Sequence, residues 1–113
     1  MHEMSLAQAL IDHVIELVEK DGCRNILSVD VSIGALSGVM REALEFCFPV
    51  VARGTALEST ILNVTEVPLK AECRDCRRIS NPEPFEITCC YCGSMNLMVT
   101  EGRDFKLISL EVE

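Results

Sequence analysis

Four cysteines in two Cys-x-x-Cys pairs are the residues of this chain most clearly arranged for chemistry. Cys73 and Cys76 form the first pair, Cys89 and Cys92 form the second, and 12 residues separate the two pairs. A two-residue gap lets both thiolates of a pair reach one ion, and two facing pairs complete the tetrahedron of a Zn²⁺ site. Gly93, directly after the second pair, suits the tight turn that such a site needs. The spacing therefore predicts a closed, structural zinc site of the zinc-ribbon kind.

The remaining cysteines leave alternatives open. Cys90 lies inside the second pair and could replace Cys89 as a ligand, but Cys89 is favoured because it keeps the two-residue spacing. Cys23 and Cys47 have apolar neighbours and are expected to be small buried hydrophobic side chains. Iron in place of zinc, or a redox-active dithiol, are the other chemistries that the four-cysteine site allows.

The N-terminus offers a second, chemically different set of ligands. Met1 supplies an α-amine, His2 an imidazole and a backbone nitrogen, and Glu3 a backbone nitrogen and a carboxylate. Nitrogen-rich, planar ligation of this kind suits Ni²⁺ or Cu²⁺, whereas Zn²⁺ prefers the thiolate tetrahedron. His13, on a predicted polar helix face beside acidic residues, is expected to be a solvated surface histidine.

Hydrophobic periodicity predicts the elements that must position these groups. A three-four spacing of apolar residues predicts an amphipathic helix over 4–19, ended by Asp21-Gly22, and a second, nearly buried helix over 41–52. Pro49 should kink the second helix or split off its last turn. Alternation places Leu27, Val29, Val31 and Ile33 on the buried face of a strand, and further strands are expected over 61–69 and 105–112.

The segment from Glu72 to about Leu97 differs in composition from the rest of the chain. It holds five of the seven cysteines together with Pro82, Pro84 and Gly93, and it has little apolar material of its own. Such a segment needs a cross-link or a metal in order to fold. The predicted fold is α+β: two helices packed on a small three-stranded sheet, with an inserted zinc-ribbon-like lobe. Residues 1–69 and 99–113 form the predicted nickel-binding α+β domain, and residues 70–98 the zinc-binding domain.

Composition excludes several classes of function. The 113 residues carry 18 acids against 10 bases, a formal net charge of −8, which disfavours binding to the nucleic-acid backbone. No apolar stretch approaches the roughly 20 residues that span a bilayer, and no basic region precedes an apolar run as in a secretory signal. We therefore expect a cytoplasmic protein with reduced thiols, which is not associated with nucleic acid or a membrane.

The order of these motifs resembles one known family. The resemblance rests on Met-His-Glu-Met-Ser-Leu at 1–6, Val-Ser-Ile-Gly-Ala-Leu-Ser-Gly-Val at 31–39, Phe-Cys-Phe-Pro-Val-Val-Ala-Arg-Gly-Thr at 46–55, and the two cysteine pairs ending in Cys-Gly-Ser at 92–94. In this combination, which spans nearly the whole chain, the sequence is similar to the HypA/HybF-type nickel metallochaperones of hydrogenase maturation.

The resemblance implies a function, partners and ligands. A member of this family delivers Ni²⁺ to the large subunit of [NiFe] hydrogenase together with the GTPase HypB, and in some organisms it also serves urease and its accessory proteins. Nickel would bind the amine of Met1, the His2 imidazole and the backbone nitrogens of His2 and Glu3. Zinc would bind Cys73, Cys76, Cys89 and Cys92, and the chain would act as a monomer or weak homodimer.

Two departures from the family pattern limit the ligand assignments that the resemblance implies for this chain. Cys90 stands where the family more often has proline, and residues 39–42 read Val-Met-Arg-Glu where some relatives place an acidic ligand, so no ligand is assigned there. Two other functions stay open: a zinc-ribbon adaptor without nickel, and a thiol oxidoreductase. Acid–base enzyme catalysis is disfavoured, since the chain has only two histidines and no evident carboxylate pair.

Overall fold

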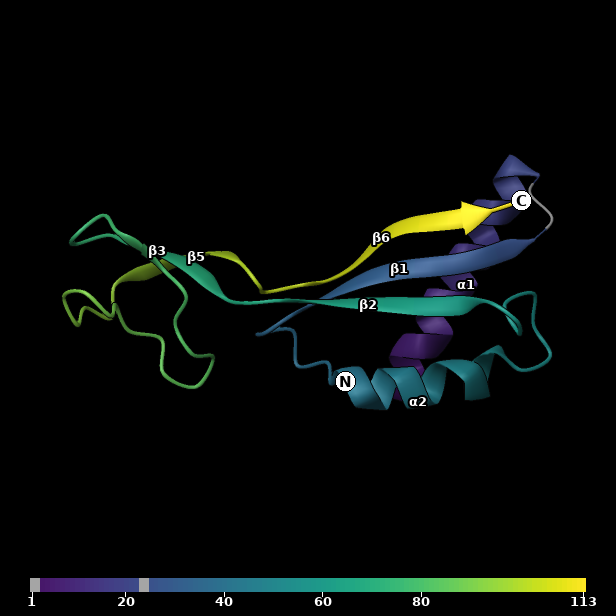
Figure 1. Ribbon diagram of the computed structural model, residues 1–113, viewed down its shortest axis with the longest axis horizontal. Helices are drawn as coiled ribbons and strands as arrows, with labels where there is room; N and C mark the ends of the chain where they lie inside the picture. The colour runs from purple at the N-terminus through teal and green to yellow at the C-terminus, as the bar shows by residue number, and fades with distance from the viewer. Residues whose placement is uncertain (1–2, 23–24) are drawn as a thin grey trace.

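The structure is a computed structural model that describes residues 3–22 and 25–113. Met1, His2 and Cys23 therefore lie outside the described residues. The elements are α1 (Glu3–Asp21), β1 (Ile26–Gly34), α2 (Arg41–Ala52), β2 (Ile61–Val67), β3 (Lys70–Cys73), β4 (Ile79–Ser80), β5 (Leu97–Glu101) and β6 (Phe105–Val112). They form two sheets that lie at opposite ends of an elongated molecule (Figure 1).

The first sheet is three-stranded, as the alternation predicted, and both helices pack with it. Its strand order is β2-β1-β6, with β1 parallel to β2 and antiparallel to β6. The predicted apolar stripe of α1 is buried, and fully buried Ile11 and Leu44 bring the two helices into one core with Val29 and Val31 of β1. Each such side chain stabilises the fold by roughly 1.5–3 kcal/mol on burial.

Of the two effects expected for Pro49, a kink or a separated last turn, helix α2 excludes the second. The helix runs without interruption from Arg41 to Ala52 with Pro49 inside it. Pro49 removes the hydrogen bond to the carbonyl of Glu45, but both residues are exposed, so water can satisfy that carbonyl. Phe48 and Ala52, both buried, hold the last turn against the core. Packing therefore outweighs the loss of one hydrogen bond.

Strand β1 corrects the expectation that Leu27 faces the core. Leu27 is 40% exposed, whereas Ile26 is buried. The register between β1 and β6 shifts between Ile26 and Ser28, as it does at a β-bulge. A bulge inserts one extra residue and reverses the alternation beyond it. Val29, Val31 and Ile33 remain on the buried face as predicted.

The second sheet belongs to the cysteine-rich part of the chain, and its strands were not predicted. Its order is β4-β3-β5, with antiparallel pairing throughout. We call residues 70–101, which include this sheet and the cysteine pairs, the cysteine lobe. Apart from the cysteines, Ala71 is the buried apolar residue of this lobe, and Leu69, just before the lobe, is buried as well. Such a small core agrees with a lobe that needs a metal for stability.

Three chain segments meet in a narrow neck between the two sheets, formed by the end of β1, residues 68–69 and residues 102–104. Backbone hydrogen bonds join them: the N–H of Gly34 donates to Asp104, and the N–H of Leu36 donates to Gly102. A Cβ added at Gly34 would lie 2.5 Å from the carbonyl of Gly102, and one at Gly102 would lie 2.6 Å from the Pro68 oxygen. The neck therefore requires glycine at both crossing points.

No helix in the described ranges is long and apolar enough to cross a membrane.

Candidate metal centre

Each cysteine pair is built on a turn with the same hydrogen bonds. In the first turn, the N–H of Cys73 donates to the Arg78 carbonyl and the N–H of Arg77 donates to the Cys73 carbonyl. In the second, the N–H of Cys89 donates to the Ser94 carbonyl and the N–H of Gly93 donates to the Cys89 carbonyl. Corresponding donors and acceptors are separated by the same number of residues, so the two turns are equivalent. We call them the first and second knuckles.

Both knuckles place a residue in the left-handed backbone region at the same position. Gly93 has a φ of 76°, which confirms the turn predicted for it, and Arg77 has a φ of 65°. Glycine adopts this conformation at little cost, whereas an arginine is strained in it. The sequence carried a clear signal for the turn at Gly93 and none at Arg77.

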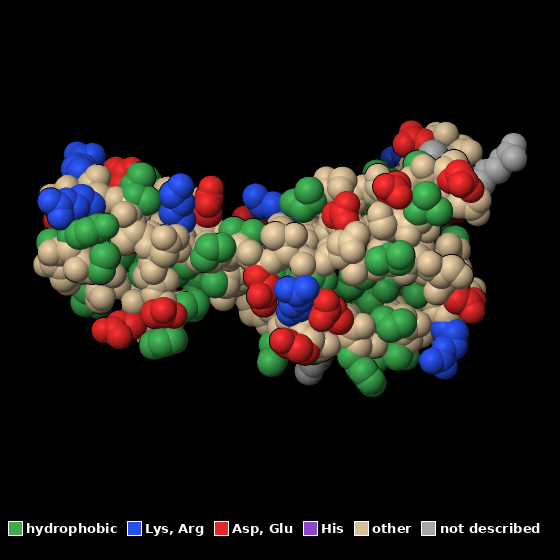
Figure 2. Space-filling view, in the orientation of Figure 1, with side chains coloured by type: hydrophobic (Ala, Val, Ile, Leu, Met, Phe, Trp, Pro, Cys, Tyr) green, Lys and Arg blue, Asp and Glu red, His purple; other side chains and the backbone are tan. Residues whose placement is uncertain are grey.

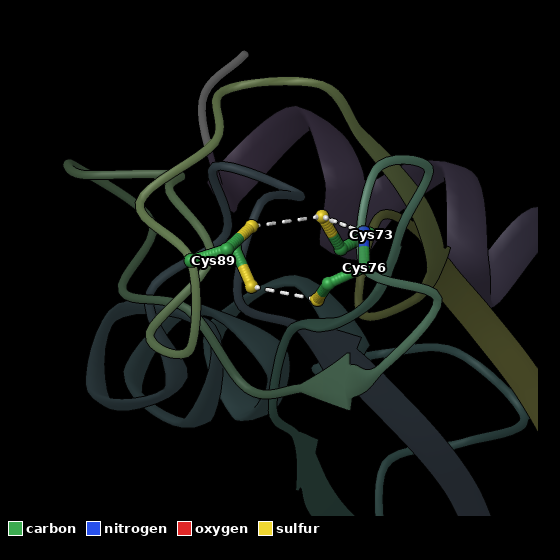
Figure 3. Close-up of side chains that lie close together, drawn as sticks. Cys73, Cys76 and Cys89 are labelled. Carbon is green, nitrogen blue, oxygen red and sulfur yellow. Dashed lines mark hydrogen bonds between the residues drawn. The ribbon is translucent and has the colours of Figure 1, made fainter.

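The four predicted zinc ligands lie together at the centre of the cysteine lobe. All four sulfurs lie within 4.8 Å of one another, with 3.6 Å between the sulfurs of Cys73 and Cys92 and 3.6 Å between those of Cys76 and Cys89. Figure 3 shows the sulfurs turned toward one another from facing loops. A tetrahedral Zn²⁺ with Zn–S bonds of about 2.3 Å needs sulfurs about 3.8 Å apart. The donors thus fit a closed ZnS₄ site.

Backbone N–H groups near two of the sulfurs favour their thiolate forms. The N–H groups of Cys92 and Tyr91 lower the pKa of Cys89 to about 6, with the N–H of Tyr91 lying 3.4 Å from the Cys89 Sγ. The N–H of Cys76 lies 3.4 Å from the Cys73 Sγ and is the main reason that the Cys73 pKa is lowered. Two of the four thiols are thus prepared to ionise.

The other two sulfurs resist ionisation in the absence of a cation. The N–H of Ser94 favours the Cys92 thiolate, but the neighbouring Cys73 sulfur and desolvation outweigh it and raise the Cys92 pKa to about 12. The Cys76 pKa is also raised, because desolvation and the neighbouring sulfurs outweigh the N–H of Arg78. Four thiolates at this spacing repel one another, and a divalent cation among them removes that repulsion.

Two further contacts join the knuckles, and no pattern in the sequence indicated either of them. The hydroxyl of Ser94 donates a hydrogen bond to the carboxylate of Asp75, and the N–H of Arg74 donates to the Asn96 carbonyl. The ligands of the two pairs are therefore held in register by groups that are not ligands themselves. Such supporting contacts orient metal ligands and adjust their affinity.

Comparison with known proteins identifies the family to which the chain belongs. The model of the family described as "Hydrogenase/urease nickel incorporation, metallochaperone, hypA" matches residues 1–112. The chain belongs to this family.

The relatives are similar over their full length. The chain is 38% identical to a hydrogenase maturation factor HypA from Nostoc, covering all of this chain and 96% of that protein. It is 36% identical to the hydrogenase maturation factor HybF of Klebsiella pneumoniae, with both chains fully covered. The solution structure of the Ni metallochaperone HypA from Helicobacter pylori superimposes with a TM-score of 0.70 at 28% identity, covering 99% of this chain and 97% of that one.

The cysteines outside the cluster behave differently from its members. Cys90 is exposed and its sulfur is not part of the four-sulfur group, whereas Cys89 is 3% exposed and belongs to it. Cys47 is partly buried and packs against the core of the α+β domain, as expected for a small hydrophobic side chain. The expectation for Cys23 falls on a residue outside the described ranges.

Only the last of the three predicted nickel residues is described. Glu3 is the first residue of α1, and its carboxylate accepts a hydrogen bond of 3.1 Å from the N–H of Met40, just before α2. The first turn of α1 therefore lies beside the start of α2, a contact that the sequence did not signal. Met1 and His2 lie outside the described residues, and His13 is exposed on α1, as expected.

Proposed function

We propose that this chain is a nickel carrier for [NiFe] hydrogenase maturation that binds Ni²⁺ at Met1, His2 and Glu3 and contains structural zinc at Cys73, Cys76, Cys89 and Cys92. The observation that carries the proposal is the family match over residues 1–112 in a chain that also presents a closed four-sulfur cluster. Four thiolates fill all four coordination positions of one tetrahedral ion, so the cluster leaves no open position for a nickel cargo. The N-terminal nitrogens are the remaining ligand set suited to nickel.

The contact that Glu3 makes supports a nickel site at the start of α1. The carboxylate of Glu3, bonded to the N–H of Met40, would anchor the chelate next to α2. In this proposal the Glu3 side chain positions the site while its backbone binds the metal.

The ligands of the two sites account for the different roles proposed for zinc and nickel. Zinc, held by four thiolates within a folded lobe, exchanges slowly and stabilises that lobe. Nickel bound by the N-terminal nitrogens, outside a four-thiolate cage, can be transferred to the ligands of a partner protein. We assign residues 1–69 and 99–113 to nickel binding and residues 70–98 to zinc binding, and we place the chain in the cytoplasm as a carrier rather than a catalyst.

The proposed partners are the GTPase HypB and the large subunit of [NiFe] hydrogenase, with urease accessory proteins as a further possibility. Family membership supports these partners, since the family's description names nickel incorporation into hydrogenase and urease.

Nickel titration calorimetry tests the N-terminal site. The zinc-loaded chain beginning at Met1 should bind one Ni²⁺, whereas a copy with a few residues ahead of Met1, or with His2→Ala, should lose this binding and keep zinc. A His13→Ala variant serves as the matched control, because His13 is exposed on α1 and lies about three helical turns from Glu3. Equal nickel binding by the extended chain would contradict the proposal and move nickel to other groups.

The pH dependence provides a second test. The amine and the imidazole must lose protons to bind nickel, so lowering the pH toward roughly 6.5 should release nickel before zinc. Parallel loss of both metals over this range, measured by metal analysis after dialysis, would contradict separate sites.

A further inference from the structure

Three arginines of the cysteine lobe are exposed and do not pair with any acidic group. Arg74 and Arg77 lie in the first knuckle and Arg78 follows it, and all three are exposed. In the part of the chain that the structure describes, the ion pairs involve only Lys20 and Arg41 as cations. The guanidinium of Arg78 instead lies over the ring of Tyr91, 4.9 Å from its centre. The first knuckle thus presents exposed guanidinium groups that form no ion pair with a carboxylate.

Exposed apolar side chains of the second knuckle lie beside these arginines. Ser94 and Asn96 are hydrogen-bonded to Asp75 and Arg74, which places Met95 between two contacts with the first knuckle. Met95 is 82% exposed and Tyr91 is 56% exposed. We call the surface formed by Arg74, Arg77, Arg78, Tyr91 and Met95 the tip face. Arginine, tyrosine and methionine are the residue types enriched where proteins bind one another.

The tip face is electrostatically separate from the acidic remainder of the chain. The cysteine lobe has four bases and five acids, so residues outside it carry seven of the eight net negative charges. Figure 2 shows basic side chains at the far end of the lobe, with acidic ones beside them and along the lower edge of the lobe, and further acidic ones over the opposite half. The molecule is 53 Å long, several times the screening length of about 8 Å at physiological salt. A partner at the tip is therefore screened from the charge of the α+β domain and encounters the local arginines, together with Asp75 and the thiolates of the zinc-loaded cluster.

Arg77 occupies a position at which the equivalent residue of the other knuckle is a glycine. Its φ of 65° matches that of Gly93, and the two make the same backbone hydrogen bond. Folding alone favours glycine there, so the strained arginine indicates a role for its side chain. This observation is independent of the charge distribution and points to the same surface.

We propose that the tip face docks an acidic, carboxylate-rich segment of a partner protein that also carries apolar side chains. The planar fork of arginine pairs with a carboxylate through two parallel hydrogen bonds, and Tyr91 and Met95 accept the apolar side chains. An extended nucleic acid fits less well, because it would continue past the tip over the acidic part of the chain. The inference goes beyond metal binding and does not depend on where nickel binds.

The test uses the full zinc-loaded chain and a synthetic peptide of glutamates interrupted by phenylalanines, with an oligothymidylate of equal length as the competing probe. The amide spectrum of the ¹⁵N-labelled chain should change on adding the peptide at the two knuckles and not in the α+β domain. Arg77→Gly should weaken binding about two- to fivefold, and its combination with Arg74→Ala about tenfold. Arg77→Gly also relieves strain, so lost binding cannot come from misfolding.

Arg53→Ala is the matched control, because it removes one exposed arginine at the end of α2, outside the lobe. It should leave peptide binding unchanged, and all variants should retain zinc. Binding that is insensitive to Arg74 and Arg77 would overturn the proposal. Tighter binding of the oligothymidylate would assign the arginines to nucleic acid instead. A dimer seen in sedimentation that Arg77→Gly dissociates would show that a second copy covers the face, and would also overturn it.

Discussion

Replacing Gly34 with alanine tests whether the neck between the two sheets is as close as the structure shows. The added Cβ would lie 2.5 Å from the carbonyl carbon and oxygen of Gly102 and 2.9 Å from the nitrogen of Arg103. These are backbone atoms that cannot rotate away, and overpacking of this kind costs about 1–3 kcal/mol. Alanine recovers about 0.4–1 kcal/mol by restricting the unfolded chain. We therefore expect a net loss of about 1–1.5 kcal/mol in the free energy of unfolding.

Two other glycines separate steric conflict from backbone strain. Gly38 has a φ of 79° and open space around it, so Gly38→Ala introduces backbone strain without a steric conflict. The strain costs roughly 1–2 kcal/mol, and after the gain from restricting the unfolded chain the net loss of stability is about 0.5–1 kcal/mol. Gly102 has a φ of 92° and would contact Pro68 and Leu69 within 2.7 Å, so Gly102→Ala combines both costs, about 3 kcal/mol.

Urea unfolding of the zinc-loaded chain, followed by far-ultraviolet circular dichroism, measures these differences. The expected order of destabilisation is Gly102→Ala, then Gly34→Ala, then Gly38→Ala, and each kcal/mol corresponds to about 4 °C in melting temperature. Zinc content should stay unchanged, because the substituted residues lie outside the knuckles. If Gly34→Ala destabilised the chain less than Gly38→Ala, the close backbone crossing in the neck would be refuted.

Three further predictions concern the cysteines, the knuckle and the open face of the sheet. Cys89→Ser should abolish stoichiometric zinc and unfold the lobe, whereas Cys90→Ser should retain both, as measured by zinc analysis and amide spectra; the reverse result would make Cys90 the ligand. Arg77→Gly should raise the free energy of unfolding by about 0.5–1 kcal/mol in urea titrations, and a decrease would contradict the assigned backbone strain. Hydrogen bonds from Ser109 and Asn63 lower the pKa of Asp30 below its usual 3.8, so they stabilise the fold above that pH. This stabilisation should disappear as the pH falls through the folded pKa of Asp30, and the difference in stability between the wild type and Asp30→Asn should narrow below about pH 4. A difference that is constant with pH would refute it.

Local patterns in the sequence were sufficient to predict the two helices, the strands of the first sheet and the grouping of the four cysteines. Helix periodicity depends on contacts three and four residues apart, so both helices were predicted within two residues of their ends. The two-residue gap within each cysteine pair brings its thiolates together through a local turn, and the structure places the four predicted cysteines in one cluster. The glycine after the second pair signalled that turn for the same reason.

The tertiary structure decided everything that depends on segments far apart in the chain. The bulge that exposes Leu27 exists only because β6 pairs with β1. The last turn of α2 stays intact because Phe48 and Ala52 pack in the core, despite Pro49 inside the helix. The contact between Gly34 and Gly102 joins residues whose separation in sequence gives no periodic signal. Short-range spacing thus determined the chemistry of the metal centre, while long-range pairing determined where its lobe is held.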